Sequence, residues 1–454
     1  MFHVAETPRV CLTLHRVHVE GFKSLRDVAL DLKGRNPVVL VGANGAGKTN
    51  IIELFLFLRR ALHDELSRRP YAPHAEWGNP RNLTWEATGT PIRVELDYML
   101  TVKNNNKYLQ EMLTYTVLFA PDPAFTTIRP VFEKIELPGL GFVLERVQNR
   151  LVTRLKAVGD MRELLHEIHK CCNDASMKCS EGWCWIEQSL KESKEDVPPV
   201  LVASAPLHVG RIAKGFTADI VLFTNCCVAL IPFPENQLEL SAGKLLGILH
   251  KWFRNIVVLR QVDYSIVKWP HNRYNDNMLQ PRAENLAEVL YRVMGNPKGR
   301  ERVEAAIATL FPWLEISVEF NEYGQIGLVF YEKRGERKIQ LYPSMVPDGV
   351  VKLLSIIVAI ALKPSLLAVD EIENSLHASL IDYLMRELED MEDPVIIATH
   401  SPVVVDLAGP ERTLLVSRST DGSTLIEKLA PPQLWEKMKE EGLMLSDYYL
   451  YTTP

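Results

Sequence analysis

The sequence predicts an α/β protein that combines a mixed β-sheet flanked by helices, an antiparallel β subdomain and an inserted helical arm. Apolar strands alternate with helices in the last third of the chain, and polar motifs directly follow two of these strands, as in parallel sheets. Between residues 91 and 147 apolar residues recur with period two, which is typical of antiparallel strands. From about Glu145 the spacing becomes helical, and a second helical tract covers Leu238 to Phe253.

Composition limits the class of protein. The chain has 454 residues, of which 47% are hydrophobic and 24% charged, and these values exclude wholesale disorder and a disulfide scaffold. At about 150 residues per domain, two to four domains are expected. The longest apolar stretch, residues 353–362, is shorter than the roughly 20 residues of a membrane span, and residues 1–10 carry no secretory signal. We therefore expect a cytoplasmic protein without membrane partners. Its formal net charge of -6 does not require a polyanionic partner.

The N-terminal elements lead to a buried strand. Apolar residues alternate from Leu12 to Val19 as in a half-buried strand, a turn follows at residues 21–24, and a second strand ends at Leu32. Residues 38–41 are apolar on both faces, as in a parallel strand inside a sheet. An apolar helix is expected from Asn50 to about His63.

The loop between that strand and that helix reads Gly-Ala-Asn-Gly-Ala-Gly-Lys-Thr, residues 42–49. Glycines let successive backbone N–H groups surround phosphate oxygens at the positive end of the following helix. Lys48 can reach the terminal phosphates, and Thr49 can place its hydroxyl on Mg²⁺. The alternative is a chance match, which arises in only about 1–2% of chains of this length. The nucleotide ligands expected here are Asn44, Gly45, Ala46, Gly47, Lys48, Thr49 and Asn50.

Two carboxylates end the apolar strand at residues 366–369. Asp370 is placed to hold Mg²⁺, and Glu371 is placed to act as general base for the attacking water; the alternative is a pair of surface acids that cap the next helix. His400 ends the next apolar strand. It is either a histidine bound to the backbone or a γ-phosphate contact, and two strands that deliver polar residues to one sheet edge favour the contact.

The domain division follows from the separation of these motifs. Lys48 and Asp370 lie roughly 320 residues apart, more than one compact domain usually spans. An insertion must therefore interrupt the sheet. We divide the chain into an N-terminal half with the phosphate loop and the antiparallel strands (1–144), a mainly helical arm (145–258) and a C-terminal half with the carboxylates and His400 (259–454).

Together these motifs resemble the ABC-type ATPase heads of the RecF, SMC and OLD (overcoming lysogenization defect) families, and most closely a stand-alone AAA ATPase branch encoded beside effector proteins. The resemblance lies in residues 12–100 and 260–430, in the family's order. It implies a P-loop NTPase fold with an ABC-type head, and ATP and Mg²⁺ as cofactors. The matching segments are residues 21–24 with the strand after them, 42–50, 284–290, 347–354, 370–377 and 399–402.

The resemblance also implies a dimer. Asp348 and Gly349 would occupy the signature position, which approaches the γ-phosphate bound by the opposite subunit. Residues 374–377 would cross the same interface. ATP would then lie between the two heads of a homodimer, and the oligomeric state beyond the dimer stays open.

The chain departs from the family pattern at a few positions. Ile372 and Ala378 stand where the family commonly has proline, and Pro347 replaces a serine before Asp348, which weakens the expected phosphate contact. The glutamine that often contacts Mg²⁺ has no assigned position. Hydrolysis is still expected because the residues most directly needed are present, namely Lys48, Asp370 and Glu371.

The expected function is an ATP-hydrolysing dimer that engages nucleic acid or a partner protein, in anti-phage defence or DNA repair. OLD proteins carry a nuclease domain after the head, whereas only roughly 50 residues follow His400, so a nuclease or toxin activity would belong to a separate effector protein. Two alternatives stay open. One is an ATP-bound scaffold that holds an effector inactive. The other is the ATP-binding subunit of a membrane transporter, which the sequence around Asp348 disfavours.

Two further groups of residues stay open. Four of the seven cysteines lie in residues 171–184, close after His166 and His169. Zinc, core thiols and a local disulfide all fit that spacing, so we assign no metal ligand. Short basic clusters are usually solvated faces and are only candidates for phosphate contact; they are Arg59-Arg60, Arg68-Arg69, Lys298 to Arg302 and Lys333 to Lys338.

Overall fold

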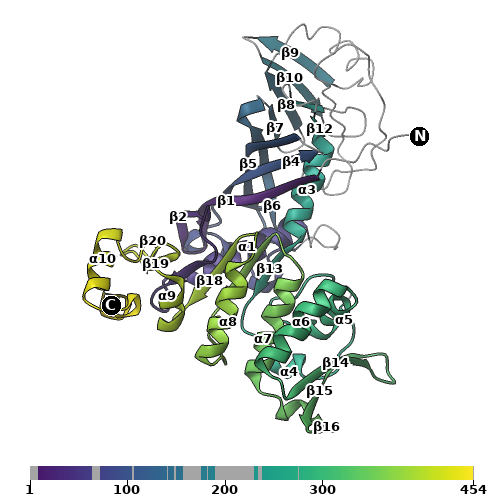
Figure 1. Ribbon diagram of the computed structural model, residues 1–454. Coiled ribbons are helices and arrows are strands. Elements are labelled where there is room, and N and C mark those ends of the chain that lie inside the picture. The colour runs from purple at the N-terminus through teal and green to yellow at the C-terminus, as the bar shows by residue number, and fades with distance from the viewer. Residues whose placement is uncertain are drawn as a thin grey trace. The chain divides into compact units, whose positions relative to one another are not determined.

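The chain divides into two compact units (Figure 1). The first holds Met1–Lys33 and Phe57–Arg254, and the second holds Gly34–Leu56 and Asn255–Pro454. The phosphate loop, the carboxylates and His400 all belong to the second unit. A computed structural model describes residues 9–63, 72–104, 107–140, 142–147, 150–156, 175–180, 183–189, 230–233, 238–274 and 276–452.

A mixed sheet of six strands forms the centre of the second unit, in the order β13-β17-β18-β3-β19-β20. The first five strands are parallel, and β20 runs antiparallel to β19. Every residue of β3, β13, β17 and β18 is buried, which explains their unbroken apolar runs. The mixed sheet is as predicted, although the sequence did not indicate β20. The strands are β3 Val38–Val41, β13 Ile256–Leu259, β17 Leu366–Asp370, β18 Val395–Thr399, β19 Thr413–Arg418 and β20 Thr424–Lys428.

Helices connect these strands. α1 begins directly after the phosphate loop, and α7 buries every side chain from Val350 to Ile360, so α7 is a core helix. A small antiparallel sheet also belongs to this unit and has the order β14-β15-β16. α1 spans Lys48–Leu62, and its residues from Phe57 on belong to the first unit. The other elements are α4 Tyr264–Val267, α5 Leu286–Met294, α6 Pro297–Leu310, β14 Leu314–Phe320, β15 Ile326–Arg334, β16 Arg337–Leu341, α7 Asp348–Ala361, α8 Ala378–Glu389, α9 Pro402–Ala408, α10 Pro432–Glu440 and α11 Leu445–Thr452.

An antiparallel sheet of nine strands forms most of the first unit, in the order β2-β1-β4-β5-β6-β7-β8-β10-β9 (Figure 1). The helix α3 packs against it: the rings of Trp252 and Tyr98 lie 5.0 Å apart, and those of Phe253 and Tyr115 lie 5.7 Å apart. The antiparallel β subdomain is therefore as predicted. The elements are β1 Arg9–Phe22, β2 Leu25–Asp31, β4 Ile92–Asn104, β5 Lys107–Pro121, β6 Ile128–Leu137, β7 Phe142–Val147, β8 Arg150–Lys156, β9 Ala175–Ser180, β10 Trp183–Ser189, β11 Leu230–Phe233, β12 Leu238–Ser241 and α3 Ala242–Arg254.

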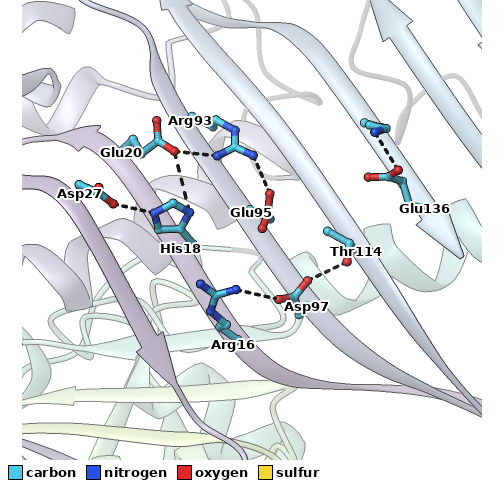
Figure 2. Close-up of polar contacts among 10 residues, drawn as sticks. Arg16, His18, Glu20, Asp27, Arg93, Glu95, Asp97, Thr114 and Glu136 are labelled. Atoms are coloured by element: carbon cyan, nitrogen blue, oxygen red, sulfur yellow. Dashed lines mark hydrogen bonds and ion pairs between the residues drawn. The ribbon is translucent and has the colours of Figure 1, made fainter. Parts of the chain in front are cut away.

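The polar face of this sheet carries paired charges (Figure 2). His18 Nε2 lies 2.7 Å from Asp27, and Arg93 bridges Glu20 at 2.7 Å and Glu95 at 2.6 Å. Cross-strand pairs of this kind are expected where one face of an antiparallel sheet meets water. Two further pairs on the same face are Arg16 with Asp97 and Lys134 with Glu136.

The helix predicted from Glu145 onward is wrong where the structure describes the chain. The strands β7 and β8 occupy this stretch; they pair with each other, and β8 pairs with β10. Val147, Leu151 and Leu155 recur every four residues, and that spacing fits the two-residue period of a strand as well as a helix. The predicted continuation at residues 161–168 lies outside the described residues.

The second helical tract is only partly right. Residues 238–241 form β12, and α3 begins at Ala242. The inserted segment is therefore not mainly helical in its described residues. Its division from the rest of the chain at residues 145 and 258 stays a prediction.

The cysteine cluster cannot be judged from the described residues, because Cys171 and Cys172 and the side chains of Cys179 and Cys184 lie outside them. Within the described part, no group of three or more His, Cys, Asp or Glu side chains is arranged to hold a metal ion. No helix among the described residues has both the length and the apolar character needed to cross a bilayer.

Candidate active site

The loop between β3 and α1 is held in a conformation that needs glycine. Gly45 and Gly47 have φ values of 77° and 111°, in the region where side chains are disfavoured. A Cβ added to Gly42 would lie 2.0 Å from the carbonyl oxygen of Val416 on β19. On the other side, the Thr424 hydroxyl donates to the carbonyl oxygen of Ala46 at 3.0 Å. The loop is therefore fixed from β19 and β20, with the glycine geometry that phosphate cradles use.

Lys48 lies folded back over this loop. Its Nζ donates to the carbonyl oxygens of Gly42 at 2.8 Å and Ala43 at 3.0 Å, and the residue is only 6% exposed. Burial lowers the pKa of Lys48, while Asp370 and two neighbouring glutamates act in the opposite direction. The ammonium is thus a buried cation that faces carboxylates, which suits a contact with terminal phosphates.

Thr49 and Asp370 come together although they are far apart in the sequence. Asp370 ends β17, is 8% exposed and accepts a hydrogen bond from the Thr49 side chain. Burial raises the pKa of Asp370, and the Thr49 hydrogen bond opposes that shift. A hydroxyl and a carboxylate side by side are hard oxygen donors, so these residues fit Mg²⁺.

Glu371 follows Asp370 in a strained conformation. Its φ is 50°, in the left-handed region that residues other than glycine rarely occupy. One of its carboxylate oxygens accepts a hydrogen bond from Asn374 Nδ2 at 2.5 Å, and the residue is exposed. The side chain is therefore accessible to water and fixed by a neighbour.

His400 lies at the end of β18 and is held by a residue that the sequence did not single out. Glu373 accepts hydrogen bonds from the Thr399 hydroxyl at 2.8 Å and from the backbone N–H of His400 at 2.6 Å. Burial lowers the pKa of His400, Lys48 lowers it further, and Glu373 and Glu371 oppose both. The imidazole is therefore neutral at pH 7 and close to Lys48. Glu373 lies within the segment 370–377 that carried the resemblance. Its hydrogen-bond partners, Thr399 and His400, come 26 and 27 residues later in the sequence, so the sequence alone did not reveal this contact.

One buried cation and one partly buried cation complete the site. Lys352 on α7 is 1% exposed, donates to the backbone oxygen of Asp370 at 3.5 Å, and has a pKa lowered to about 8 by burial. Arg260 follows β13, pairs with Glu53 on α1 at 2.9 Å, and helps to lower the pKa of Asp370. Both cations were missed in the sequence, although a single lysine in the apolar run of α7 was a visible signal.

The topology also offers a position for the unassigned glutamine. β13 runs parallel to β17, with Leu259 opposite Val369. Gln261, two residues further on, therefore emerges at the same sheet edge as Asp370 and Glu371. Gln261 is exposed.

Asp348 and Gly349 lie beside the loop 374–377. A Cβ on Gly349 would lie 2.4 Å from the carbonyl oxygen of Ser375. Asp348 begins α7 and pairs with Lys268 at 2.6 Å. In the described part of the chain neither residue makes a hydrogen bond to the phosphate loop.

The departures from the family pattern are accommodated locally. Ile372 is fully buried in the core of the second unit. Ala378 is the first residue of α8, and His377 caps that helix by accepting a hydrogen bond from the N–H of Ser379. Neither position therefore needs the proline.

Several residues of the basic clusters are buried or paired with carboxylates. Arg59 is only 2% exposed, so the prediction that it could contact a phosphate is wrong. Arg60 pairs with Glu76 at 2.9 Å. Residues 68–69 lie outside the described residues. Three other pairs neutralise the remaining clusters in part, namely Arg302 with Glu387, Arg334 with Glu332 and Lys338 with Glu315.

Comparison with known proteins gives a family match. Residues 38–101 and 247–406 match the family described as "AAA domain, putative AbiEii toxin, Type IV TA system". No curated protein matches the chain. Similar solved structures include the SMC head domain from Thermotoga maritima, which is 14% identical, covers 92% of this chain and 100% of that chain, and has a TM-score of 0.39.

Two further SMC heads were solved with a partner. The SmcHead bound to the C-winged helix domain of ScpA is 13% identical, covers 93% of this chain and 99% of that chain, and has a TM-score of 0.43. The Smc head domain with an extended coiled coil, bound to the C-terminal domain of ScpA derived from Pyrococcus furiosus, is 12% identical, covers 95% and 100%, and has a TM-score of 0.44.

Proposed function

We propose that the chain is an ABC- and SMC-like ATPase head that binds ATP with Mg²⁺ and hydrolyses it to ADP and phosphate. The match of residues 38–101 and 247–406 to the AAA-domain family supports this proposal. One observation carries the proposal. Residues from three separate segments converge at one sheet edge. The Thr49 hydroxyl lies on Asp370, Lys48 faces Asp370 and Glu371, and His400 lies close to Lys48.

The residues divide the work of hydrolysis. The glycine loop and Lys48 bind the phosphates and offset their charge. Thr49 and Asp370 would hold Mg²⁺, with Gln261 as a further candidate ligand, and the ion would offset the charge of the phosphates. Glu371 accepts a proton from water as the water oxygen bonds to the γ-phosphorus and the bond from phosphorus to the ADP oxygen breaks. The neutral His400 donates a hydrogen bond to a γ-phosphate oxygen.

A homodimer is the second part of the proposal. Two groups would contact the nucleotide bound by a second copy of the chain. The first is Asp348 with Gly349, and the second is the loop 374–377. Among the described residues, neither group makes a hydrogen bond to the phosphate loop of its own chain. The Asp348 side chain is 49% exposed, and Ser375 and His377 are exposed. Residues that contribute only across an interface should be accessible in the single chain.

The dimer would couple ATP to a partner. A separate effector protein is the first candidate, and nucleic acid is the second. The paired charges of Figure 2 and of β14–β16 argue against an open basic face on those strands. A role in defence or repair rests on the family resemblance.

Titration of the purified chain with ATP, with and without Mg²⁺, tests the binding step. We expect binding that Mg²⁺ strengthens and that Lys48→Ala abolishes. Equal affinity of wild type and Lys48→Ala would overturn the proposal. Turnover with added double-stranded DNA then separates the partners: stimulation indicates nucleic acid, and an unchanged rate indicates a protein.

The scaffold alternative has its own observation, which is the hydrogen bond that Asn374 donates to Glu371. If that contact occupies the carboxylate oxygen that would accept the proton, ATP would be bound and not turned over. Asn374→Ala would then raise turnover. A turnover lower than wild type would instead place Asn374 among the residues that orient the base.

A further inference from the structure

A short segment contacts both parts of the proposed dimer face. This segment, Tyr264 to Lys268, comprises α4 and the residue after it, and we call it the α4 clip. Lys268 Nζ donates to the carbonyl oxygen of Val346 and to Asp348 Oδ1, both at 2.6 Å. The Tyr264 hydroxyl donates to Ser375 Oγ at 3.3 Å. The α4 clip therefore joins the start of α7 to the loop that follows β17.

Lys268 is restrained more strongly than an ordinary surface lysine. Its side chain is 11% exposed, and its Nζ lies 5.7 Å from the centre of the Tyr264 ring. Val267, the neighbouring residue, is buried and anchors the clip in the core. Exposed ion pairs contribute little, because two flexible side chains must be ordered and water screens their charges. A lysine already held by a carbonyl and a ring loses less freedom when it pairs with Asp348.

The two parts that the clip joins also touch each other. A side chain on Gly349 would clash with the carbonyl oxygen of Ser375, since its Cβ would lie 2.4 Å away. Ser375 itself has a φ of 65°, which the surrounding contacts must maintain. Because the Gly349 backbone lies against the Ser375 carbonyl with no room for a side chain, a shift at Gly349 would also displace the loop 374–377.

We infer that Lys268 is a positioning residue for Asp348 and Gly349, and that the α4 clip holds these residues and Ser375 as one unit. The inference rests on the proposed function, in which this unit meets the nucleotide of a second copy. A bare carboxylate at that place would repel a γ-phosphate. Lys268 offsets the charge of Asp348 and fixes the direction of its carboxylate.

Hydrogen exchange of the chain without nucleotide tests the positioning role independently of ATP. Lys268→Met removes the cation at similar length, and we expect amide exchange to rise by at least about tenfold in residues 346–351 and 374–377, with residues 395–399 unchanged. Lys268→Arg should stay close to wild type. Lys298→Met, on the exposed first turn of α6, is the matched control. Wild-type exchange in Lys268→Met overturns the inference, and so does a general rise that includes the strands of the sheet.

The second readout is self-association with ATP, measured by sedimentation in a Glu371→Gln background. We expect Lys268→Met to weaken ATP-dependent self-association by at least about tenfold while ATP affinity changes by less than about threefold. Adding Asp348→Asn should restore part of the association, because the stranded carboxylate is then removed. If the double variant self-associates no more strongly than Lys268→Met alone, the inference is overturned. If the chain without the Lys268 change binds ATP but never self-associates, the proposed dimer fails, and hydrogen exchange still decides the role of Lys268.

Discussion

Lys352 Nζ on α7 lies 3.5 Å from the backbone oxygen of Asp370 at the end of β17. This contact places a buried cation directly behind the carboxylate that we expect to hold Mg²⁺. It also connects the helix that begins with Asp348 to the strand that ends with Asp370. The arrangement lowers the stability of the fold, because burial disfavours the charged form of Lys352 and lowers its pKa to about 8. A buried charge is retained only where its partners compensate for the lost contact with water.

Lys352→Met should therefore stabilise the fold and impair the site. The lowered pKa means that the folded chain disfavours the charged form; that penalty is complete below pH 8 and is relieved as the pH rises from about 8 toward 10.5. We expect the free energy of unfolding to rise by about 1 kcal/mol at pH 7, with the gain shrinking toward pH 10. Urea unfolding at both pH values measures this. A loss of stability at pH 7 would mean that the contact with Asp370 outweighs the burial penalty.

Asp393 tests the same relationship between a shifted pKa and the pH dependence of stability, at a position away from the candidate active site. Burial, and to a smaller extent Glu392, raise the pKa of Asp393 to about 6. The folded chain therefore holds this proton more tightly than the unfolded chain, so stability is lost as the pH rises from about 4 through 6. Asp393→Asn should raise the free energy of unfolding at pH 7 by about 1 kcal/mol after allowance for solvent screening. At pH 4 variant and wild type should coincide, and an equal gain at both pH values would contradict the assignment.

Glu373→Gln tests how His400 is held. The carboxylate accepts from two donors, whereas a glutamine presents one acceptor and one donor, so one hydrogen bond is replaced by a mismatch. We expect a loss of about 1–2 kcal/mol in the free energy of unfolding and a turnover reduced by about tenfold. Loss of the carboxylate should also lower the pKa of His400 further, which an NMR titration follows. Glu322→Gln, on an exposed turn, is the control, and an unchanged His400 titration would contradict the account.

Asp370→Asn tests the metal ligands. The amide keeps the shape of the side chain and removes its charge, so the dependence of ATP affinity on Mg²⁺ should fall by at least about tenfold. Thr49→Val should have a similar but smaller effect, and Thr309→Val on α6 should have none. Calorimetric titration with and without Mg²⁺ measures the difference. If the ATP affinity of Asp370→Asn depends on Mg²⁺ as strongly as that of the wild type, Asp370 is not a metal ligand.

The strands and helices around the site could be predicted because each has its own pattern. β3, β17 and β18 are short apolar runs followed at once by polar motifs, and that pattern is set by burial in a parallel sheet. The roles of Thr49 and Asp370 as metal ligands were predicted from these motifs taken together. Glu373 and Arg260 could not be found this way, since their partners lie on other elements and become visible only when the sheet is assembled.

The segment after Glu145 shows the opposite case. Apolar residues four apart satisfy both a helix and a strand, and only pairing with β6 and β10 decides in favour of strands. Lys352 shows a missed signal of a different kind. A single lysine inside the apolar run of α7 had to be buried, and a buried lysine needs acceptors.

The most direct test of the account is steady-state ATP hydrolysis by wild type, Lys48→Ala and Glu371→Gln, measured with Mg²⁺. The account predicts turnover by wild type and a rate reduced by at least about a hundredfold in both variants, because one loses the phosphate contact and the other the general base. Glu371→Gln should still bind ATP, and Lys48→Ala should not. Wild-type turnover no higher than that of Lys48→Ala would contradict the claim that this chain hydrolyses ATP.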